Sequence, residues 1–166
     1  VGFQLRIGEM TTPILYAELA TSLGIEVGGK ASVVATREAT LKLREKKGML
    51  LDPKDHDSWS AGSFFTNPII SAETAEKLPS DAPRWVQPDG RVKTSAAWLM
   101  EHAGVHKGDA LSGARISTKH VLALTNMGSA TAADIAALAR QAQEKVHATF
   151  GIMLEAEVNL IGISLQ

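Results

Sequence analysis

Residues 131–160, TAADIAALARQAQEKVHATFGIMLEAEVNL, predict a long helix that leads directly into a strand. Thr131 and Asp134 have the spacing of a capping box, in which each residue satisfies a backbone N–H of the other at a helix start. The apolar residues that follow recur at helical spacing: Ile135, Leu138, Ala139, Ala142 and Val146. Gly151 can end this helix, because glycine readily takes the left-handed conformation common at helix C-termini.

Residues 152–160 alternate between two kinds of side chain, which is the period of a strand. One face carries Ile152, Leu154, Ala156, Val158 and Leu160, and the other carries Met153, Glu155, Glu157 and Asn159. Upstream of the long helix, helical and strand patterns follow one another irregularly. We therefore predict an α+β fold, with one mixed sheet and helices packed on it.

The upstream elements are predicted from shorter patterns. Helices are expected at 15–23, 32–47, 71–78 and 94–102, the second capped by Ser32 and the last by Thr94; strands are expected at 3–7, 84–86, 114–117 and 120–125. Residues 52–60, DPKDHDSWS, are mostly polar and predict an irregular loop. This loop is the expected boundary between a first and a second structural unit.

Composition excludes several classes of function. The 166 residues carry a net charge of −1, which argues against nucleic acid as the main partner. The chain has no cysteine, so it has no disulfide framework and no thiolate nucleophile or metal ligand, and a reducing cytoplasm suits it. No apolar run approaches the roughly 18–20 residues of a membrane span. Since no initiator Met precedes Val1, we expect a fragment or a trimmed chain.

Residue types alone leave the chemistry open. The side chains of Glu155 and Glu157 point to the same side of the predicted strand. They form either a proton-sharing pair or part of an ordinary solvated surface. Ser63 stands between a glycine and two aromatic residues, either beside a ligand or in a tight turn, and no Gly-x-Ser-x-Gly elbow surrounds it. The Lys47 side chain either binds a phosphate or complements the negative end of the helix dipole at the helix C-terminus. Residues 55–57, DHD, lack a second ligand cluster and are interpreted as a polar loop, not a metal site.

Residues 61–68, AGSFFTNP, resemble the Gly-Ser-Phe-Phe-Lys-Asn-Pro signature of the UDP-N-acetylenolpyruvoylglucosamine reductases, also called UDP-N-acetylmuramate dehydrogenases. Further segments resemble the family's motifs in the same order: REKK at 44–47, KTSAAWLME at 93–101, His120 with the Thr-Asn strand end after it, and FGIMLEAEV at 150–158. The resemblance covers nearly the whole chain, and the long loop before Gly62 is similar to that of actinobacterial members. Thr66 replaces the signature's usual lysine, a change that we expect to be tolerated because its neighbours are kept.

The resemblance implies roles for particular residues. Ser63 would donate a proton to the reacting carbon of the substrate, and Glu157 would stabilise the enolic intermediate, with Glu155 ranked below it. The substrate-binding residues would be Lys47 and Asn67 on the pyrophosphate, Arg44 nearby, and Gly62 and His120. No metal ligand is expected.

The resemblance also implies a domain order and cofactors. Residues 1–52 would be the end of a flavin-binding domain, 53–153 the substrate-binding domain and 154–166 a returning C-terminal strand. The intact enzyme would use NADPH and FAD to reduce UDP-N-acetylglucosamine enolpyruvate to UDP-N-acetylmuramate in peptidoglycan synthesis, serving cell-wall biogenesis, cell shape and division. The family's FAD-binding half is missing from this sequence, so we expect no cofactor-binding residue here and no turnover by the chain alone. A cytoplasmic monomer is expected.

Two other functions stay open at this point. One is a stand-alone UDP-sugar-binding module without redox chemistry, motivated by the missing flavin half. The other is an interaction domain, because an apolar face meant for flavin docking would resemble a protein-binding surface.

Overall fold

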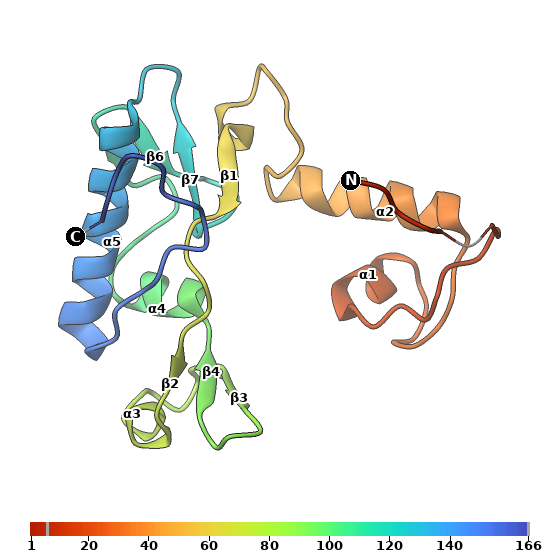
Figure 1. The fold of residues 1–166 in the computed structure, drawn as a ribbon, viewed down its shortest axis with the longest axis horizontal. Coiled ribbons are helices and arrows are strands. Elements are labelled where there is room, and N and C mark those ends of the chain that lie inside the picture. The colour runs from red at the N-terminus through yellow and green to blue at the C-terminus, as the bar shows by residue number, and fades with distance from the viewer. Residues whose placement is uncertain (6, 166) are drawn as a thin grey trace. The chain divides into compact units, whose positions relative to one another are not determined.

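The computed structural model describes residues 1–5 and 7–165, which divide into two units, Val1–Leu50 and Leu51–Gln166. Both helices and antiparallel sheets are present, so the predicted α+β class is confirmed (Figure 1). The finer division at residues 52 and 153 stays a prediction. Among the described residues, no helix is both long enough and apolar enough to span a membrane.

Two helices form most of the first unit, α1 (Ala17–Ser22) and α2 (Val33–Lys46). Ser32 caps α2 as predicted, because its side chain accepts a hydrogen bond from the Ala35 N–H at 3.1 Å. The predicted strand at 3–7 is wrong: its described residues 3–5 and 7 are not in a strand, and Phe3 is 84% exposed. Alternation alone does not make a strand without a paired neighbour.

The second unit contains two sheets (Figure 1). The larger has the order β1-β7-β6-β5, with β1 at Ser60–Ser63, β7 at Ala123–Asn126, β6 at Ala114–Ile116 and β5 at Ala110–Leu111. The smaller has the order β2-β4-β3, with β2 at Ile69–Ile70, β4 at Val92–Thr94 and β3 at Arg84–Val86. All pairings between these strands are antiparallel, which corrects the expected single mixed sheet. The short connections from β3 to β4, from β5 to β6 and from β6 to β7 allow only antiparallel pairing of those strands.

The helices of this unit are α3 (Ala72–Glu76), α4 (Ala96–His102) and α5 (Ala132–Phe150), with a short 3-10 turn η1 (His56–Ser58) inside the predicted loop. The predicted capping box of α5 is confirmed: Asp134 N–H donates to Thr131 Oγ1 at 3.2 Å, and Thr131 N–H donates to Asp134 Oδ2 at 2.8 Å. Gly151 ends α5 with φ 68°. The helix packs across β6 and β7 (Figure 1).

The core of the second unit lies between α4, α5 and the larger sheet. Its largest fully buried apolar side chains are Phe65, Leu99, Met100, Ile116, Leu138, Val146 and Leu154. The segment after Gly151 keeps the predicted alternation, since Ile152 and Leu154 are buried and Glu155 and Glu157 are exposed. It forms a single bridge from Ala156 to Phe65 rather than a full strand, because further pairing partners are not present among the described residues.

Candidate functional site

Ser63 ends β1, where the backbone is irregular. The register between β1 and β7 shifts between Ser60 and Ser63, and Gly62 has φ 88°, a conformation that residues with a Cβ rarely adopt. Irregularities of this kind re-aim a side chain at the end of a strand. The half-buried Ser63 places its Oγ 3.4 Å from Nε2 of His120.

His120 lies in the turn between β6 and β7. The buried Ser117 side chain holds this turn by accepting the backbone N–H groups of Lys119 at 3.1 Å and His120 at 3.3 Å. The carbonyl of His120 accepts the Ala123 N–H at 3.0 Å, which leads the chain into β7. The fold thus brings together two residues that are 57 positions apart in the sequence.

Glu157 is placed by backbone hydrogen bonds. Its N–H donates to the Phe64 carbonyl at 2.8 Å, while the Thr66 N–H donates to the Glu155 carbonyl at 2.9 Å. These two bonds flank the bridge between Phe65 and Ala156. The backbone of Glu157 is therefore bonded to the residue that follows Ser63, and both glutamate side chains are exposed.

Asn67 joins the signature segment to the start of α4. Its Oδ1 accepts the Ala96 N–H at 2.9 Å, and the neighbouring Pro68 carbonyl accepts the Thr94 N–H at 3.0 Å. The predicted cap of α4 moves by one residue, because Ser95 rather than Thr94 accepts the Trp98 N–H. The two sequence segments that resemble family motifs, 61–68 and 93–101, therefore contact each other directly.

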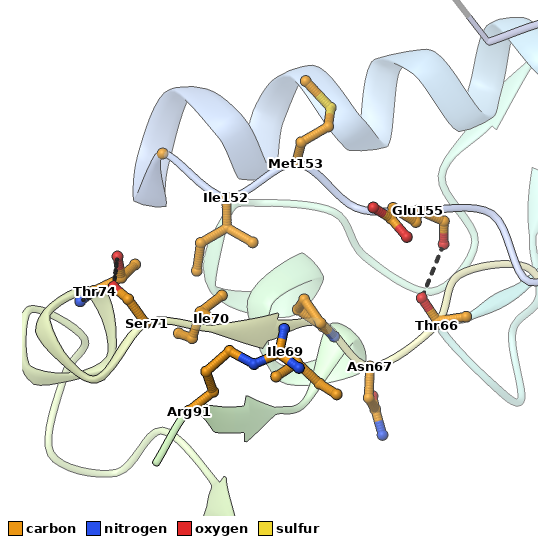
Figure 2. Close-up of a pocket in the computed structure, with 12 residues that line it drawn as sticks. Thr66, Asn67, Ile69, Ile70, Ser71, Thr74, Arg91, Ile152, Met153 and Glu155 are labelled. Carbon is orange, nitrogen blue, oxygen red and sulfur yellow. Dashed lines mark hydrogen bonds between the residues drawn. The ribbon is translucent and has the colours of Figure 1, made fainter. Parts of the chain in front are cut away.

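A cavity of about 580 Å³ lies beside Asn67. Figure 2 shows β2 and its flanking residues on one side and the segment after α5 on the other. Arg91 contributes a positive charge to this cavity and also pairs with Asp89 at 2.8 Å. Glu155 lines the opposite side, and the Thr66 hydroxyl donates to its carbonyl at 3.4 Å (Figure 2). The cavity thus combines both charges with polar and apolar walls.

Lys47 and Arg44 belong to the first unit, at the C-terminal end of α2. Lys47 Nζ lies 2.5 Å from Oε2 of Glu18, and Arg44 Nε donates to the Met49 carbonyl at 3.4 Å. Both residues line a cavity of about 250 Å³ together with Tyr16. The other predicted site residues lie in the second unit. Lys47 and Arg44 lie before the boundary at Leu50 and so belong to the first.

Asp57 belongs to a polar network that the sequence does not predict. Its Oδ1 accepts from Arg115 Nη2 at 2.9 Å and from the Thr118 N–H at 3.0 Å, and its Oδ2 accepts from the Thr118 hydroxyl. Asp57 is only 4% exposed, although it stands in a loop that was interpreted as polar and irregular. No local pattern marks it, because its partners lie 58 and 61 residues further along the chain.

The environment of Asp57 changes its acidity. Burial disfavours the charged carboxylate, but the hydrogen bonds from Thr118 and Arg115 outweigh burial and hold the pKa of Asp57 below its ordinary value of 3.8. Asp57 is therefore an ionised group at neutral pH, and its negative charge is balanced by the Arg115 guanidinium.

This depressed pKa predicts an acid-sensitive part of the stability. Because folding lowers the pKa, the carboxylate stabilises the fold fully above its ordinary value of 3.8 and loses that contribution as pH falls through the folded pKa. Wild type should thus have a higher melting temperature than Asp57→Asn at pH 7, and the difference should shrink towards pH 3. Melting followed by circular dichroism across this range measures the difference. A gap that is constant with pH would contradict the assignment.

Comparisons with known proteins relate this chain to one family. Residues 52–161 match the family model described as "UDP-N-acetylenolpyruvoylglucosamine reductase, C-terminal domain". The chain is 48% identical over 168 residues to the UDP-N-acetylenolpyruvoylglucosamine reductase of Cutibacterium acnes. This match covers 99% of this chain and 44% of that protein. It is 50% identical over 175 residues to the reductase of Thermobifida fusca, and the match covers 99% of this chain and 49% of that protein.

A solved structure is also similar to this chain. The reductase from Thermus caldophilus matches with a TM-score of 0.44 and 25% identity, over 79% of this chain and 37% of that one. The chain spans about half the length of the curated relatives that it matches. The family model, by contrast, matches 52–161, which is most of this chain and includes nearly all of its second unit. The chain therefore belongs to the UDP-N-acetylenolpyruvoylglucosamine reductase family, of which it contains the C-terminal domain.

Proposed function

We propose that this chain is the substrate-binding part of an oxidoreductase that converts UDP-N-acetylglucosamine enolpyruvate to UDP-N-acetylmuramate in peptidoglycan synthesis. The observation that carries the proposal is Ser63, whose hydroxyl stands at an irregular strand end beside His120, inside the matched region. The relatives of the chain are named for this reductase activity. We place the protein in the cytoplasm as a monomer.

The proposed cofactors are FAD and NADPH. The sequence has no Gly-x-Gly-x-x-Gly fingerprint of a dinucleotide-binding loop. We therefore assign flavin binding to the part of the relatives that this chain does not cover. When bound, the flavin supplies the hydride that the substrate double bond receives.

The residues of this chain do the proton chemistry and the binding. Ser63 gives its hydroxyl proton to the carbon next to the one that receives hydride; a hydroxyl is a weak acid, but an enolate-like carbon is a far stronger base. Glu157 stabilises the enolic charge, best in its protonated or hydrogen-bonded form. The backbone bond from Glu157 N–H to the Phe64 carbonyl supports this assignment, because Phe64 directly follows Ser63 in the chain.

Substrate binding is assigned to the cationic and amide groups. Lys47 and Asn67 bind the pyrophosphate, with Arg44 nearby, and His120 contacts the sugar or phosphate. Gly62 lacks a side chain and leaves open space where a Cβ would stand, so the backbone beside Ser63 can approach the ligand closely. These contacts fix the non-reacting end of the substrate and so position its double bond.

The test uses a full-length chimera, in which the N-terminal part of the Cutibacterium acnes relative precedes this chain. NADPH should bleach the bound flavin under anaerobic conditions, and the enolpyruvyl UDP-sugar should then restore its absorbance. UDP-N-acetylglucosamine without the enolpyruvyl group is the control and should restore nothing. Failure of the enolpyruvyl sugar to reoxidise a reduced, flavin-loaded chimera would reject the proposed function.

Lys47→Ala should weaken substrate binding in the same chimera. A charge-assisted hydrogen bond to a phosphate contributes about 1.5–3 kcal/mol, so KM for the UDP-sugar should rise roughly 10- to 100-fold with a small change in kcat. The matched control is Lys46→Ala, which removes the same charge from the adjacent, exposed position of α2. Initial rates at varied substrate concentration give both constants. Equal effects of the two substitutions would show that Lys47 acts only through general charge.

A further inference from the structure

Two loops of the second unit are joined by a buried carboxylate. Asp57 of η1 accepts hydrogen bonds from Arg115 and from both donors of Thr118, and the three residues together are named the Asp57 clamp. The Asp57 side chain is 6% exposed and that of Arg115 is 23% exposed. Because buried charge-assisted bonds are short and directional, this clamp fixes the distance between the two loops.

The clamp stands at one end of a closed frame around Ser63 and His120. Asp57 precedes Ser63 by six residues, and Thr118 precedes His120 by two. At the other end of the frame, the Phe64 N–H donates to the Leu122 carbonyl at 2.7 Å. Ser63 and His120 therefore lie opposite each other between two fixed cross-links.

The contact inside this frame is sensitive to small movements. The separation of 3.4 Å between Ser63 Oγ and His120 Nε2 is near the upper limit for a hydrogen bond. A displacement of a few tenths of an ångström in the turn before His120 would break the contact, or would shorten it into a strong bond. The cross-links on either side set its length.

We propose that Asp57 and Thr118 are positioning residues that hold His120 against Ser63 during proton transfer. This inference rests on the proposed function. As the Ser63 O–H bond breaks and a C–H bond forms on the substrate, an electron pair stays on Oγ, and the Nε2–H of His120 donates a hydrogen bond to that developing alkoxide. A proton from solvent later restores the hydroxyl. His120 is thus a catalytic residue as well as a substrate contact.

The test compares substitutions at Thr118 in the full-length chimera. Thr118→Val removes the hydroxyl donor at nearly constant shape, while Thr118→Ser retains it. Thr149→Val is the matched control, because it removes a hydroxyl that donates to the Lys145 carbonyl on the exposed side of α5. Asp57→Ala removes the whole clamp and is a second, more severe variant.

Loss of position should appear in the chemical step. Since misplacement by about 1 Å costs on the order of 100-fold, we expect flavin reoxidation by substrate to slow roughly 10-fold in Thr118→Val and roughly 100-fold in Asp57→Ala. KM for the UDP-sugar should change by a smaller factor than the rate, and Thr118→Ser and Thr149→Val should keep the wild-type rate. Loss of melting temperature with an unchanged rate, or a rise in KM alone, would overturn the proposal.

A double substitution separates positioning from general damage. If the clamp acts through Ser63, Thr118→Val should cause no further loss in a Ser63→Ala background, because the step that it supports is already absent. An equal fold-loss in both backgrounds would overturn the proposal.

A measurement on this chain alone decides the geometry independently of turnover. The nuclear Overhauser effect between the His120 ring protons and the Ser63 β-protons should weaken in Thr118→Val and keep its wild-type intensity in Thr149→Val. Wild-type intensity in Thr118→Val would overturn the proposal even if the chimera were active. A chimera that fails to react with the enolpyruvyl sugar would instead reject the proposed function and leave this geometric result standing.

Discussion

Ser63→Ala in the full-length chimera is expected to slow the reoxidation of reduced flavin by the UDP-sugar roughly 100- to 10,000-fold, the usual range for loss of a positioned general acid. The methyl group cannot supply a proton to the enolate-like carbon, and water reaches a half-buried position poorly. Reduction of the flavin by NADPH should be unchanged, because that half-reaction needs no proton from Ser63. Anaerobic stopped-flow measurement of the two half-reactions separates these effects.

The matched control for this prediction is Ser60→Ala at the other end of β1. The Ser60 hydroxyl accepts the Gly62 N–H at 3.3 Å and has no part in the proposed proton transfer. Its removal should leave both half-reactions near their wild-type rates. If Ser63→Ala slows both half-reactions equally, the assignment of Ser63 as proton donor is wrong.

Phe65→Ala should produce the largest loss of stability among single substitutions near the site, about 3–5 kcal/mol. The Phe65 ring is 1% exposed, and it stands edge-on to Phe64 with 5.0 Å between ring centroids. Truncation removes apolar burial and leaves a cavity beneath the bridge to Ala156. Urea unfolding followed by circular dichroism measures the loss.

Phe3→Ala is the matched control for this stability prediction. Phe3 is 84% exposed, so its truncation should change the free energy of unfolding by less than about 0.5 kcal/mol. Similar losses for the two substitutions would mean that Phe65 does not carry the core packing assigned to it.

Local signals predicted the ends of several elements well. Ser32 and Thr131 each cap the helix that was predicted for them, because capping depends on residues within one turn. The cap of α4 was missed by one residue, since Thr94 and Ser95 both have suitable hydroxyls. The buried Thr94 side chain donates instead to the Pro83 carbonyl, a tertiary contact that local sequence does not contain.

The parts of the fold that the sequence did not predict depend on contacts between residues that are far apart in the chain. The alternation at 152–160 separates the buried Ile152 and Leu154 from the exposed Glu155 and Glu157, although Leu160 on the apolar face is exposed. The number of strand pairings depends on a neighbour, and only Phe65 pairs with this segment among the described residues. The contact of Ser63 with His120 and the burial of Asp57 likewise join residues that are far apart. Ser63 was identified as a site residue by the resemblance to a known family. The spacing of residues alone did not identify it.

The bridge between Phe65 and Ala156 has a consequence for chemical probing of the site. Its hydrogen bonds use only main-chain atoms of Glu155 and Glu157, so they do not depend on which side chains those positions carry. Exchange of the Glu157 carboxyl for an amide therefore alters acidity while the path of the backbone stays the same. A series of substitutions at Glu157 would therefore report electronic effects with little contribution from misfolding.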